Sequence, residues 1–207
     1  VTHLVVNNYS RIGYVFTGWN TRPDGNGISY EDSAEIYNLS TADYRDRTTW
    51  TEEDNGTVIL YAQWRPCKST LKVDAAGGSY NGESVFSVTG EYQKKYALQE
   101  AHIEPPEGCL IKFETTGGTP VAPVRGTNHF EEWMRILPFQ GQIDGGSYIF
   151  PAADGHTDTV KAVYQPDPIT LPFTSREGWS FGGWYYDTSF TKPAGAPGDR
   201  IIPSASL

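Results

Sequence analysis

The residue types that most often bind metals are spread thinly along this sequence. Its histidines and cysteines have no metal-ligand spacing and form no Cys-x-x-Cys pair; they are His3, His102, His129, His156, Cys67 and Cys109. Asp-Gly-Asn-Gly at residues 24–27 opens like a calcium loop but lacks the later carboxylates and the bidentate glutamate. The sequence therefore predicts no metal site and no cofactor, and it favours a turn at residues 24–27.

Catalytic motifs are equally sparse. The chain contains no Gly-x-Ser-x-Gly elbow, no Walker loop and no dinucleotide fingerprint. Thr-Thr-Gly-Gly at residues 115–118 lies between strand-like runs rather than before a helix, so it cannot present amides to a phosphate. No acidic pair is singled out for glycoside hydrolysis, although any two acids can meet in a fold. The sequence predicts no catalytic residues, and a hydrolase is the third of three functional interpretations.

Aromatic rings are the main remaining source of binding chemistry. Tyrosine and tryptophan on a β face can stack on sugar rings, and the candidates are Trp50, Tyr185 and Tyr186. The favoured interpretation is that these rings pack at the edges of small hydrophobic cores or between neighbouring modules. Ligand contact by the three rings is the alternative.

The two cysteines permit one disulfide. A bridge between Cys67 and Cys109 is one interpretation. A free buried thiol is the favoured one, because Cys109 lies in the apolar run CLIKF. So low a count does not distinguish a cytosolic protein from a bacterial surface protein.

Charge and composition narrow the class of protein. The 207 residues carry a formal net charge of −9, whereas binding to nucleic acid or to an anionic membrane needs clustered Lys and Arg. The 22 glycines and 14 prolines divide the chain into short runs, as in mainly β proteins with tight turns. No apolar run is long enough to span a membrane and no signal peptide opens the sequence, so we expect a segment of a longer chain.

One motif occurs twice, far apart in the chain. Residues 11–20 read RIGYVFTGWN and residues 176–185 read REGWSFGGWY. Tyr14 and Phe16 are two residues apart, so they share one face of a strand. Trp19 lies three residues after Phe16, and a bulge at Gly18 would bring it back to that face. Such a tryptophan can anchor a small core because it buries roughly 150–250 Å².

The repetition predicts three modules. Module 1 spans residues 1–65 and closes with TVILYAQW, module 2 spans residues 66–166, and module 3 spans residues 167–207 without a closing strand. A short helix or turn is expected over EDSAEIYNL in module 1. Module 2 is degenerate, and either Phe113 or the Phe130–Trp133 pair takes the place of the motif aromatics. The proline-containing linkers RPCKS and QPDPI join the modules as semi-rigid connections.

The motif, followed by Leu-Tyr-Ala-x-Trp at residues 60–64, resembles the Listeria–Bacteroides repeat, the module also seen as the B repeat of internalin B. The resemblance implies a mainly β or α+β chain of tandem small β-grasp-like modules, each a short β-sheet with one short helix. It also implies that the motif residues form the core of each module. These residues are Gly13, Tyr14, Phe16, Gly18, Trp19, Tyr61, Trp64, Gly178, Trp179, Phe181, Gly183 and Trp184.

The same resemblance implies a non-enzymatic module array of a secreted or cell-wall-attached bacterial surface protein. Such an array acts as a spacer and as an adhesion or protein-contact element. The expected partner is a protein or a cell-wall or host glycan, with no nucleic acid and no membrane insertion within this chain. The alternative is a carbohydrate-binding appendage of an extracellular polysaccharide-degrading enzyme. Both interpretations place the chain outside the cell, at the cell surface or in the cell wall.

Overall fold

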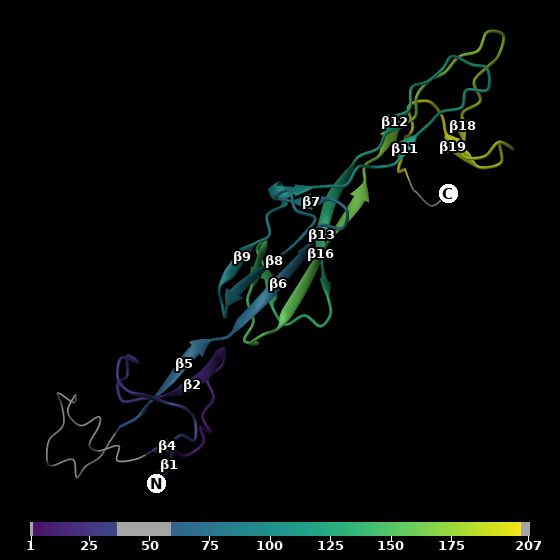
Figure 1. Ribbon diagram of the computed structural model, residues 1–207. Coiled ribbons are helices and arrows are strands. Elements are labelled where there is room, and N and C mark those ends of the chain that lie inside the picture. The colour runs from purple at the N-terminus through teal and green to yellow at the C-terminus, as the bar shows by residue number, and fades with distance from the viewer. Residues whose placement is uncertain (1, 37–58, 204–207) are drawn as a thin grey trace. The chain divides into compact units, whose positions relative to one another are not determined.

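The computed structural model describes residues 2–36 and 59–203, and it consists mainly of short β-strands and the loops between them (Figure 1). The helical element among these residues is the 3₁₀ turn η3 (Glu100–His102). The mainly β class is confirmed. Of the short helix or turn expected over residues 31–39, residues 31–36 form a turn at Asp32 and Ser33 that leads into the strand β4 (Glu35–Ile36), and the helix is not seen there. The β-grasp resemblance stays a prediction, and Trp50 lies outside the described residues.

Contacts between residues divide the chain into two compact units. Unit 1 comprises residues 1–71, 89–97 and 140–157, and unit 2 comprises residues 72–88, 98–139 and 158–207. Residues of the predicted module 2 fall in both units. The three-module division stays a prediction about sequence repeats, whereas the two units describe how the residues pack.

Unit 1 contains three small sheets, with strand orders β1-β4, β3-β2-β5 and β14-β15-β9. Their strands, besides β4, are β1 (Thr2–His3), β2 (Tyr14–Asn20), β3 (Ser29–Tyr30), β5 (Tyr61–Pro66), β9 (Lys95–Ala97), β14 (Gln142–Asp144) and β15 (Ser147–Ile149). The paired strands in these sheets are antiparallel.

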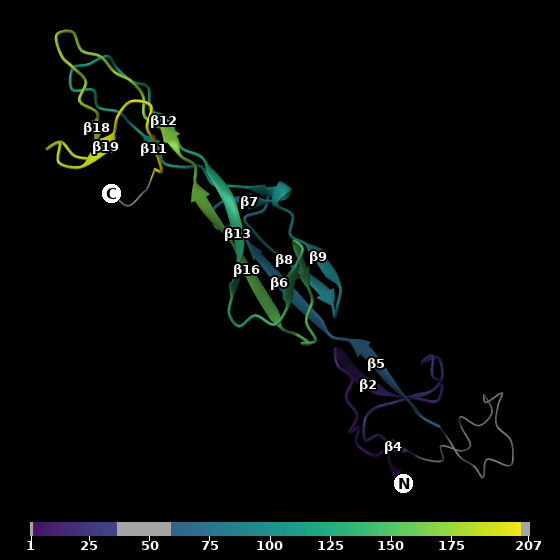
Figure 2. The same cartoon turned by 180° about the vertical axis from the view of Figure 1, so that it is seen from behind.

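The four-stranded sheet β13-β16-β6-β8 is the largest in the structure, and most of its residues belong to unit 2. Its strands are β6 (Lys68–Asp74), β8 (Val85–Glu91), β13 (Asn128–Ile136) and β16 (Thr157–Pro166). The long strands β13 and β16 lie side by side in both views (Figure 1 and Figure 2). Unit 2 adds four two-stranded sheets, built from β7 (Ser79–Tyr80) with β10 (Ile103–Glu104), β11 (Leu110–Ile111) with β12 (Val124–Arg125), β17 (Ile169–Thr170) with β20 (Arg200–Ile201), and β18 (Trp184–Tyr185) with β19 (Pro193–Gly195).

The bulge expected at Gly18 is confirmed. The register of β2 against β5 shifts between Phe16 and Gly18, so Trp19 returns to the side of the sheet that carries Phe16. The two rings meet edge to face with their centroids 5.3 Å apart. Gly18 has φ of +134°, and a Cβ there would lie 2.6 Å from the carbonyl oxygen of Tyr30, so this close approach requires glycine.

The same bulge identifies the motif of module 2. The register of β13 against β16 shifts between Phe130 and Glu132, and the Phe130 and Trp133 rings lie 5.3 Å apart. This arrangement matches Phe16 and Trp19 in module 1. The Phe130–Trp133 pair therefore takes the place of the motif aromatics, and Phe113 belongs elsewhere.

The core of the large sheet in unit 2 is built on alternate residues of its strands. Val73 of β6 and Val160 and Ala162 of β16 are buried, as expected for one apolar face of a pleated sheet. Tyr80 is also buried, and its ring lies 5.9 Å from that of Trp133. The motif tryptophan of module 2 thus completes the same core as the sheet.

The segment that joins β5 to β6 is held by a bidentate ion pair. Nη1 and Nη2 of Arg65 donate to the carboxylate of Asp154 at 2.7 and 2.8 Å, and the amide of Lys68 donates to the same carboxylate at 2.9 Å. Between these residues, Cys67 is buried and its amide donates to the carbonyl of Gly13 at 2.8 Å. The predicted linker RPCKS is therefore an ordered part of unit 1.

A pH-dependent test follows from this ion pair. Hydrogen bonds from Arg65 and from the Lys68 amide hold the pKa of Asp154 well below its usual range. A carboxyl with a lowered folded pKa stabilises the fold above its unfolded pKa of about 3.9, and that contribution is lost as the pH falls through the folded value. We expect Asp154→Asn to unfold at a lower temperature than the parent at neutral pH, with the difference shrinking in strong acid.

Thermal unfolding followed by circular dichroism, from neutral pH into strong acid, measures this difference. The matched control is Asp144→Asn, because Asp144 faces Lys95 at 3.8 Å and both side chains are exposed. Equal midpoints for Asp154→Asn and the parent at neutral pH would contradict the expectation.

Candidate functional site

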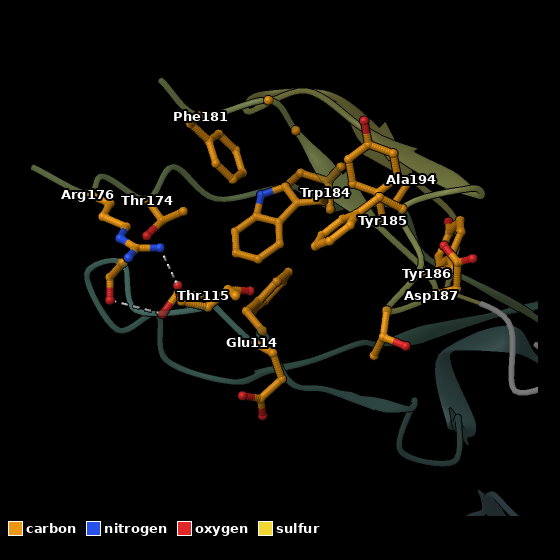
Figure 3. A pocket seen from close by; sticks show the side chains of 18 of the residues that line it. Glu114, Thr115, Thr174, Arg176, Phe181, Trp184, Tyr185, Tyr186, Asp187 and Ala194 are labelled. Carbon is orange, nitrogen blue, oxygen red and sulfur yellow. Dashed lines mark hydrogen bonds between the residues drawn. The ribbon is translucent and has the colours of Figure 1, made fainter. Parts of the chain in front are cut away.

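The strongest candidate site is an aromatic pocket in unit 2, formed around the second copy of the motif (Figure 3). The cavity has a volume of about 800 Å³, and two stretches of chain, residues 111–118 and 171–187, provide most of its wall. Figure 3 shows Trp184 near the middle, with Phe181 and Tyr185 on either side. The lining is therefore rich in aromatic rings.

The pocket is built on the same local geometry as the first copy of the motif. The Phe181 and Trp184 rings lie 5.2 Å apart, close to the 5.3 Å between Phe16 and Trp19. Gly183 repeats the positive φ seen at Gly18, with a value of +113°. The motif thus produces one compact aromatic arrangement at both ends of the chain.

The arginine that opens each motif packs on the next aromatic ring. The guanidinium of Arg11 lies 3.8 Å from the centroid of Tyr14, and that of Arg176 lies 4.6 Å from the centroid of Trp179. Each pair closes a turn, in which the aromatic amide donates to the arginine carbonyl at 3.0 Å in the first copy and 3.1 Å in the second. This shared turn explains why the motif begins with Arg-x-Gly.

Trp184 is the buried centre of the site. It is 8% exposed, and its Nε1 donates to the carbonyl of Pro172 at 2.7 Å. Its ring lies 5.0 Å from the ring of Phe113, which comes from a distant part of the sequence. Trp184 therefore joins the motif to residues 111–118.

Phe113 lies between β11 (Leu110–Ile111) and a turn whose geometry matches a turn near the start of module 2. In that module Gly78 donates to the Ala75 carbonyl at 2.9 Å, and Gly118 donates to the Thr115 carbonyl at the same distance. The positive φ angles also agree, with +49° and +92° at residues 76 and 77, and +49° and +86° at residues 116 and 117. Residues 115–118 thus repeat the turn at residues 75–78, and both turns lie within the predicted module 2. The repeated strand-then-Gly-Gly pattern was the signal that pointed to them.

Comparison with known protein families decides what these repeats are. The family model described as the Listeria–Bacteroides repeat domain matches residues 1–44 and 144–206, together just over half of the chain. The chain belongs to the Listeria–Bacteroides repeat family. Repeats of this family are typical of bacterial surface proteins and are generally non-catalytic. Both matched segments contain a copy of the motif with its aromatic pair.

A curated relative supports the same class of protein. The chain is 25% identical over 198 residues to a protein of Evansella cellulosilytica described as "Putative Gly-rich membrane protein". The aligned region covers 89% of this chain but only 20% of that protein. No solved structure matches this chain significantly. Across the residues that the structure describes, no helix is long and apolar enough to cross a membrane.

Three residues predicted to lie in the core of the Listeria–Bacteroides repeat are on the surface. Trp179 is 68% exposed, and its ring packs against the guanidinium of Arg176. Tyr61 is 36% exposed on the outer face of β5, and Gly178 is also exposed. The core prediction is therefore wrong for these three residues.

The remaining predicted core residues of the family motif are more enclosed. Tyr14, Phe16, Trp19, Trp64, Phe181 and Gly183 are half-buried, and Gly13, Gly18 and Trp184 are buried. Trp19 differs from Trp184 in one respect, because its Nε1 is buried and has no hydrogen-bond partner among the described residues.

The predicted ligand-contact tyrosines lie at the rim of the pocket. Tyr185 is 37% exposed and Tyr186 is 45% exposed. The Tyr185 ring packs edge-on against Phe190 at 5.4 Å. The two tyrosines remain candidates for ligand contact.

The polar side chains around the pocket mainly form hydrogen bonds to nearby groups of the protein. Nη1 of Arg176 donates to the carbonyl of Thr116 at 3.1 Å, and Oγ1 of Thr174 donates to the carbonyl of Thr119 at 2.7 Å. Asp187 accepts from the hydroxyl and amide of Thr191 and from a further amide, and the hydroxyl contact leads the causes that lower the pKa of its carboxyl. These bonds fix loops and leave the aromatic surface as the chemically distinctive part of the site.

The Asp-Gly-Asn-Gly segment is also explained by structure. The side chain of buried Asn20 donates to the carbonyl of Gly25 at 3.0 Å and accepts from the amide of Gly27 at 3.0 Å. Asp24 accepts from the amide of Asn26, and this bond lowers the pKa of the Asp24 carboxyl. The segment is a turn that Asn20 organises. In the described part of the chain, no group of three or more His, Cys, Asp or Glu side chains is placed to hold a metal.

The two cysteines lie in different environments and both are free. Cys67 is buried in the joint after β5, whereas Cys109 is exposed before β11. The structure therefore contains no Cys67–Cys109 bridge, and the buried thiol is Cys67 rather than Cys109.

The two tryptophans of the second motif copy allow a direct test of core against surface. We expect Trp184→Ala to lower the free energy of unfolding by about 3–5 kcal/mol, because truncating a buried aromatic leaves a cavity. Trp179→Ala should change it by about 1 kcal/mol or less, the usual range for an exposed cation–π contact. Urea denaturation followed by tryptophan fluorescence and circular dichroism measures both values. Similar losses for the two variants would contradict the assignment.

Alanine substitutions at two matched glycines separate the cost of a left-handed backbone from the cost of a steric overlap. Gly13 and Gly178 have φ of +78° and +75°, but a Cβ at Gly13 would overlap the Tyr92 ring while a Cβ at Gly178 meets open space. Gly178→Ala should cost about 1–2 kcal/mol, the price of a left-handed alanine. Gly13→Ala should cost more in the same denaturation experiment. Equal costs would show that Tyr92 moves aside freely.

Proposed function

We propose that this chain is a non-catalytic array of small β-grasp-like modules in a secreted or cell-wall-attached bacterial surface protein. It acts there as a spacer and as an adhesion or protein-contact element. The observation that carries the proposal is the threefold recurrence of one aromatic core, with Phe–Trp pairs at residues 16 and 19, 130 and 133, and 181 and 184. Membership of the Listeria–Bacteroides repeat family supports the surface role.

Ordered connections between the repeats support the spacer role. Arg65 and Asp154 hold the first connection within unit 1. In unit 2, Asp167 of the QPDPI segment accepts from the hydroxyl of Thr127 at 2.6 Å and faces Nδ1 of His129 at 2.7 Å. The proline-containing linkers are thus held to neighbouring segments by hydrogen bonds and an ion pair, as suits a spacer.

Exposed rings in module 3 support the contact role. Phe173, Trp179 and Phe190 are all more than half exposed, and Tyr185 and Tyr186 are partly exposed. Exposed aromatic clusters are enriched at recognition surfaces, because a rigid ring buries a large area at low entropic cost. Of the partners that the family resemblance implies, a protein is the one proposed for these rings, and a glycan is left to the alternative function.

The alternative function is carbohydrate binding as an appendage of an extracellular polysaccharide-degrading enzyme. The specific observation in its favour is that Tyr185 and Tyr186 lie at the rim of an aromatic pocket, where rings can stack on a sugar.

Binding screens on protein arrays and glycan arrays, together with an assay for polysaccharide hydrolysis, distinguish these functions. We expect the intact folded chain to bind a surface or matrix protein in a saturable manner, to bind no glycan specifically and to hydrolyse no polysaccharide. A specific glycan hit that falls at least tenfold in affinity on Tyr186→Ala, without loss of stability, would favour the alternative. The matched control is Tyr9→Ala, because Tyr9 is an exposed tyrosine in module 1. Polysaccharide turnover would overturn the non-catalytic proposal.

A further inference from the structure

The strand that carries the motif tryptophan, here called the motif strand, is β2 in module 1, β13 in module 2 and β18 in module 3. In module 1, β3 pairs with β2 on the side away from β5 and sets Tyr30 opposite Trp19. In module 3, β19 pairs with β18 and sets Gly195 opposite Trp184. A short strand thus covers the motif strand beside its tryptophan in both modules.

The glycine that precedes the motif tryptophan makes room for this covering strand. A Cβ at Gly18 would lie 2.6 Å from the carbonyl oxygen of Tyr30, and a Cβ at Gly183 would lie 3.1 Å from that of Gly195. Module 2 has Glu132 at the same position, and this residue is exposed. A side chain fits there because no strand of the described chain covers that edge of module 2.

The motif strand of module 2 is therefore an open edge strand. β13 is nine residues long, and β16 is its one partner among the described strands. Across the same part of the chain, residues 130–136 make no backbone hydrogen bond outside the sheet. Module 2 contains its first strand β6, its motif strand and the strand β16 that closes it, so the open edge belongs to a module with all three strands in place. Such an edge is a template for another strand, because its N–H and C=O groups can form a new ladder.

The charges along β13 are complementary to those of a second, antiparallel copy of the same strand. The first half of the strand carries Glu131 and Glu132. The second half carries Arg135, and Lys161 of β16 lies opposite Met134 there. Antiparallel pairing about the middle of the strand sets the acidic half of each copy against the basic half of the other, whereas parallel pairing would set like charges together.

Exposed apolar side chains continue the same edge. Met134 is 43% exposed, Ile136 is 38% exposed and Leu137 is 82% exposed. A lysine or a proline commonly blocks an exposed edge strand, and residues 132–136, which follow the bulge, contain neither. The edge of β13 thus combines free backbone groups, apolar side chains and self-complementary charge.

We propose that the outer edge of β13 is a self-association surface, to which a second copy of this chain adds its own β13 in antiparallel orientation. The two four-stranded sheets then form one continuous sheet about a twofold axis, so the same surface serves both copies. Copies of a surface protein are held at a high local concentration, so weak pairing is sufficient. This surface is separate from the rings of module 3, and the inference therefore goes beyond the proposed contact role.

Sedimentation velocity of the intact chain, from about 1 μM to about 1 mM, tests the proposal down to weak protein affinities. We expect a reversible monomer–dimer equilibrium. Met134→Lys should raise the dissociation constant about tenfold, because it places a charge at the edge of the strand. The matched control is Val85→Lys, because Val85 is 47% exposed on β8, the strand at the other edge of the sheet. The control should leave the equilibrium unchanged.

A charge-swap pair tests the antiparallel arrangement. Arg135→Glu makes the strand acidic throughout, and the double substitution Glu131→Lys with Glu132→Lys makes it basic. We expect each variant to dimerise more weakly than the parent when alone, and a mixture of the two to form a heterodimer. Circular dichroism checks the fold of each variant, and mixing does not rescue a variant that has merely unfolded.

Hydrogen exchange locates the interface. We expect the amides of residues 132–136 to exchange more slowly in concentrated than in dilute solution, and those of β8 to stay unchanged. A chain that stays monomeric up to about 1 mM would overturn the proposal. Equal dimerisation of the parent and Met134→Lys, or protection confined to other residues, would overturn it as well. Protection of residues 132–136 only after another protein is added would replace the second copy by that protein as the occupant.

This inference and the proposed function fail in different ways. If the chain stays monomeric while the protein-array screen finds a partner, the contact role stands and the self-association surface is wrong. If the chain dimerises through residues 132–136 and the screen finds no other protein, the self-association surface stands and the wider contact role needs revision.

Discussion

The structure depends on an edge-to-face pair of a phenylalanine and a tryptophan from one bulged strand. Without the bulge, residues three apart on a strand face opposite sides of the sheet, and one ring would lie in water. With it, both rings pack together on one face of the sheet, which has three strands in module 1 and four in module 2. Three Phe–Trp pairs of this spacing, with centroids 5.2–5.3 Å apart, give each repeat a core that its short strands could not otherwise provide.

The bulge does not depend on glycine alone. Gly18 and Gly183 take positive φ angles where the motif is well preserved, whereas Glu132 occupies the equivalent position of module 2. The register shift is retained there because the aromatic pair and the closing strand still specify it. Packing of the rings is thus the constraint, and glycine is the residue that satisfies it most easily.

The proposed function depends on the groups of module 3 that form neither the motif core nor the hydrogen bonds of its loops. The polar side chains around module 3 bond to nearby backbone groups, as Arg176 does to Thr116 and Thr174 does to Thr119, so they hold loops in place. What faces outward there is aromatic surface, with Phe173, Trp179 and Phe190 more than half exposed. Such a surface suits contact with another macromolecule, in agreement with a family that is typical of bacterial surface proteins.

Local patterns in the sequence were sufficient for the mainly β class, the repeated motif, the bulge at Gly18 and the membership of the repeat family. Each of these depends on residues within about ten positions of one another, where spacing alone sets which side chains share a face. Contacts between residues far apart in the sequence decided the remaining features of the fold. Phe113 joins the core around Trp184, Trp179 lies outside it, and β4 occupies part of the segment expected as a short helix or turn. These outcomes depend on which distant strand packs against a residue, and spacing along the chain carries no information about that choice.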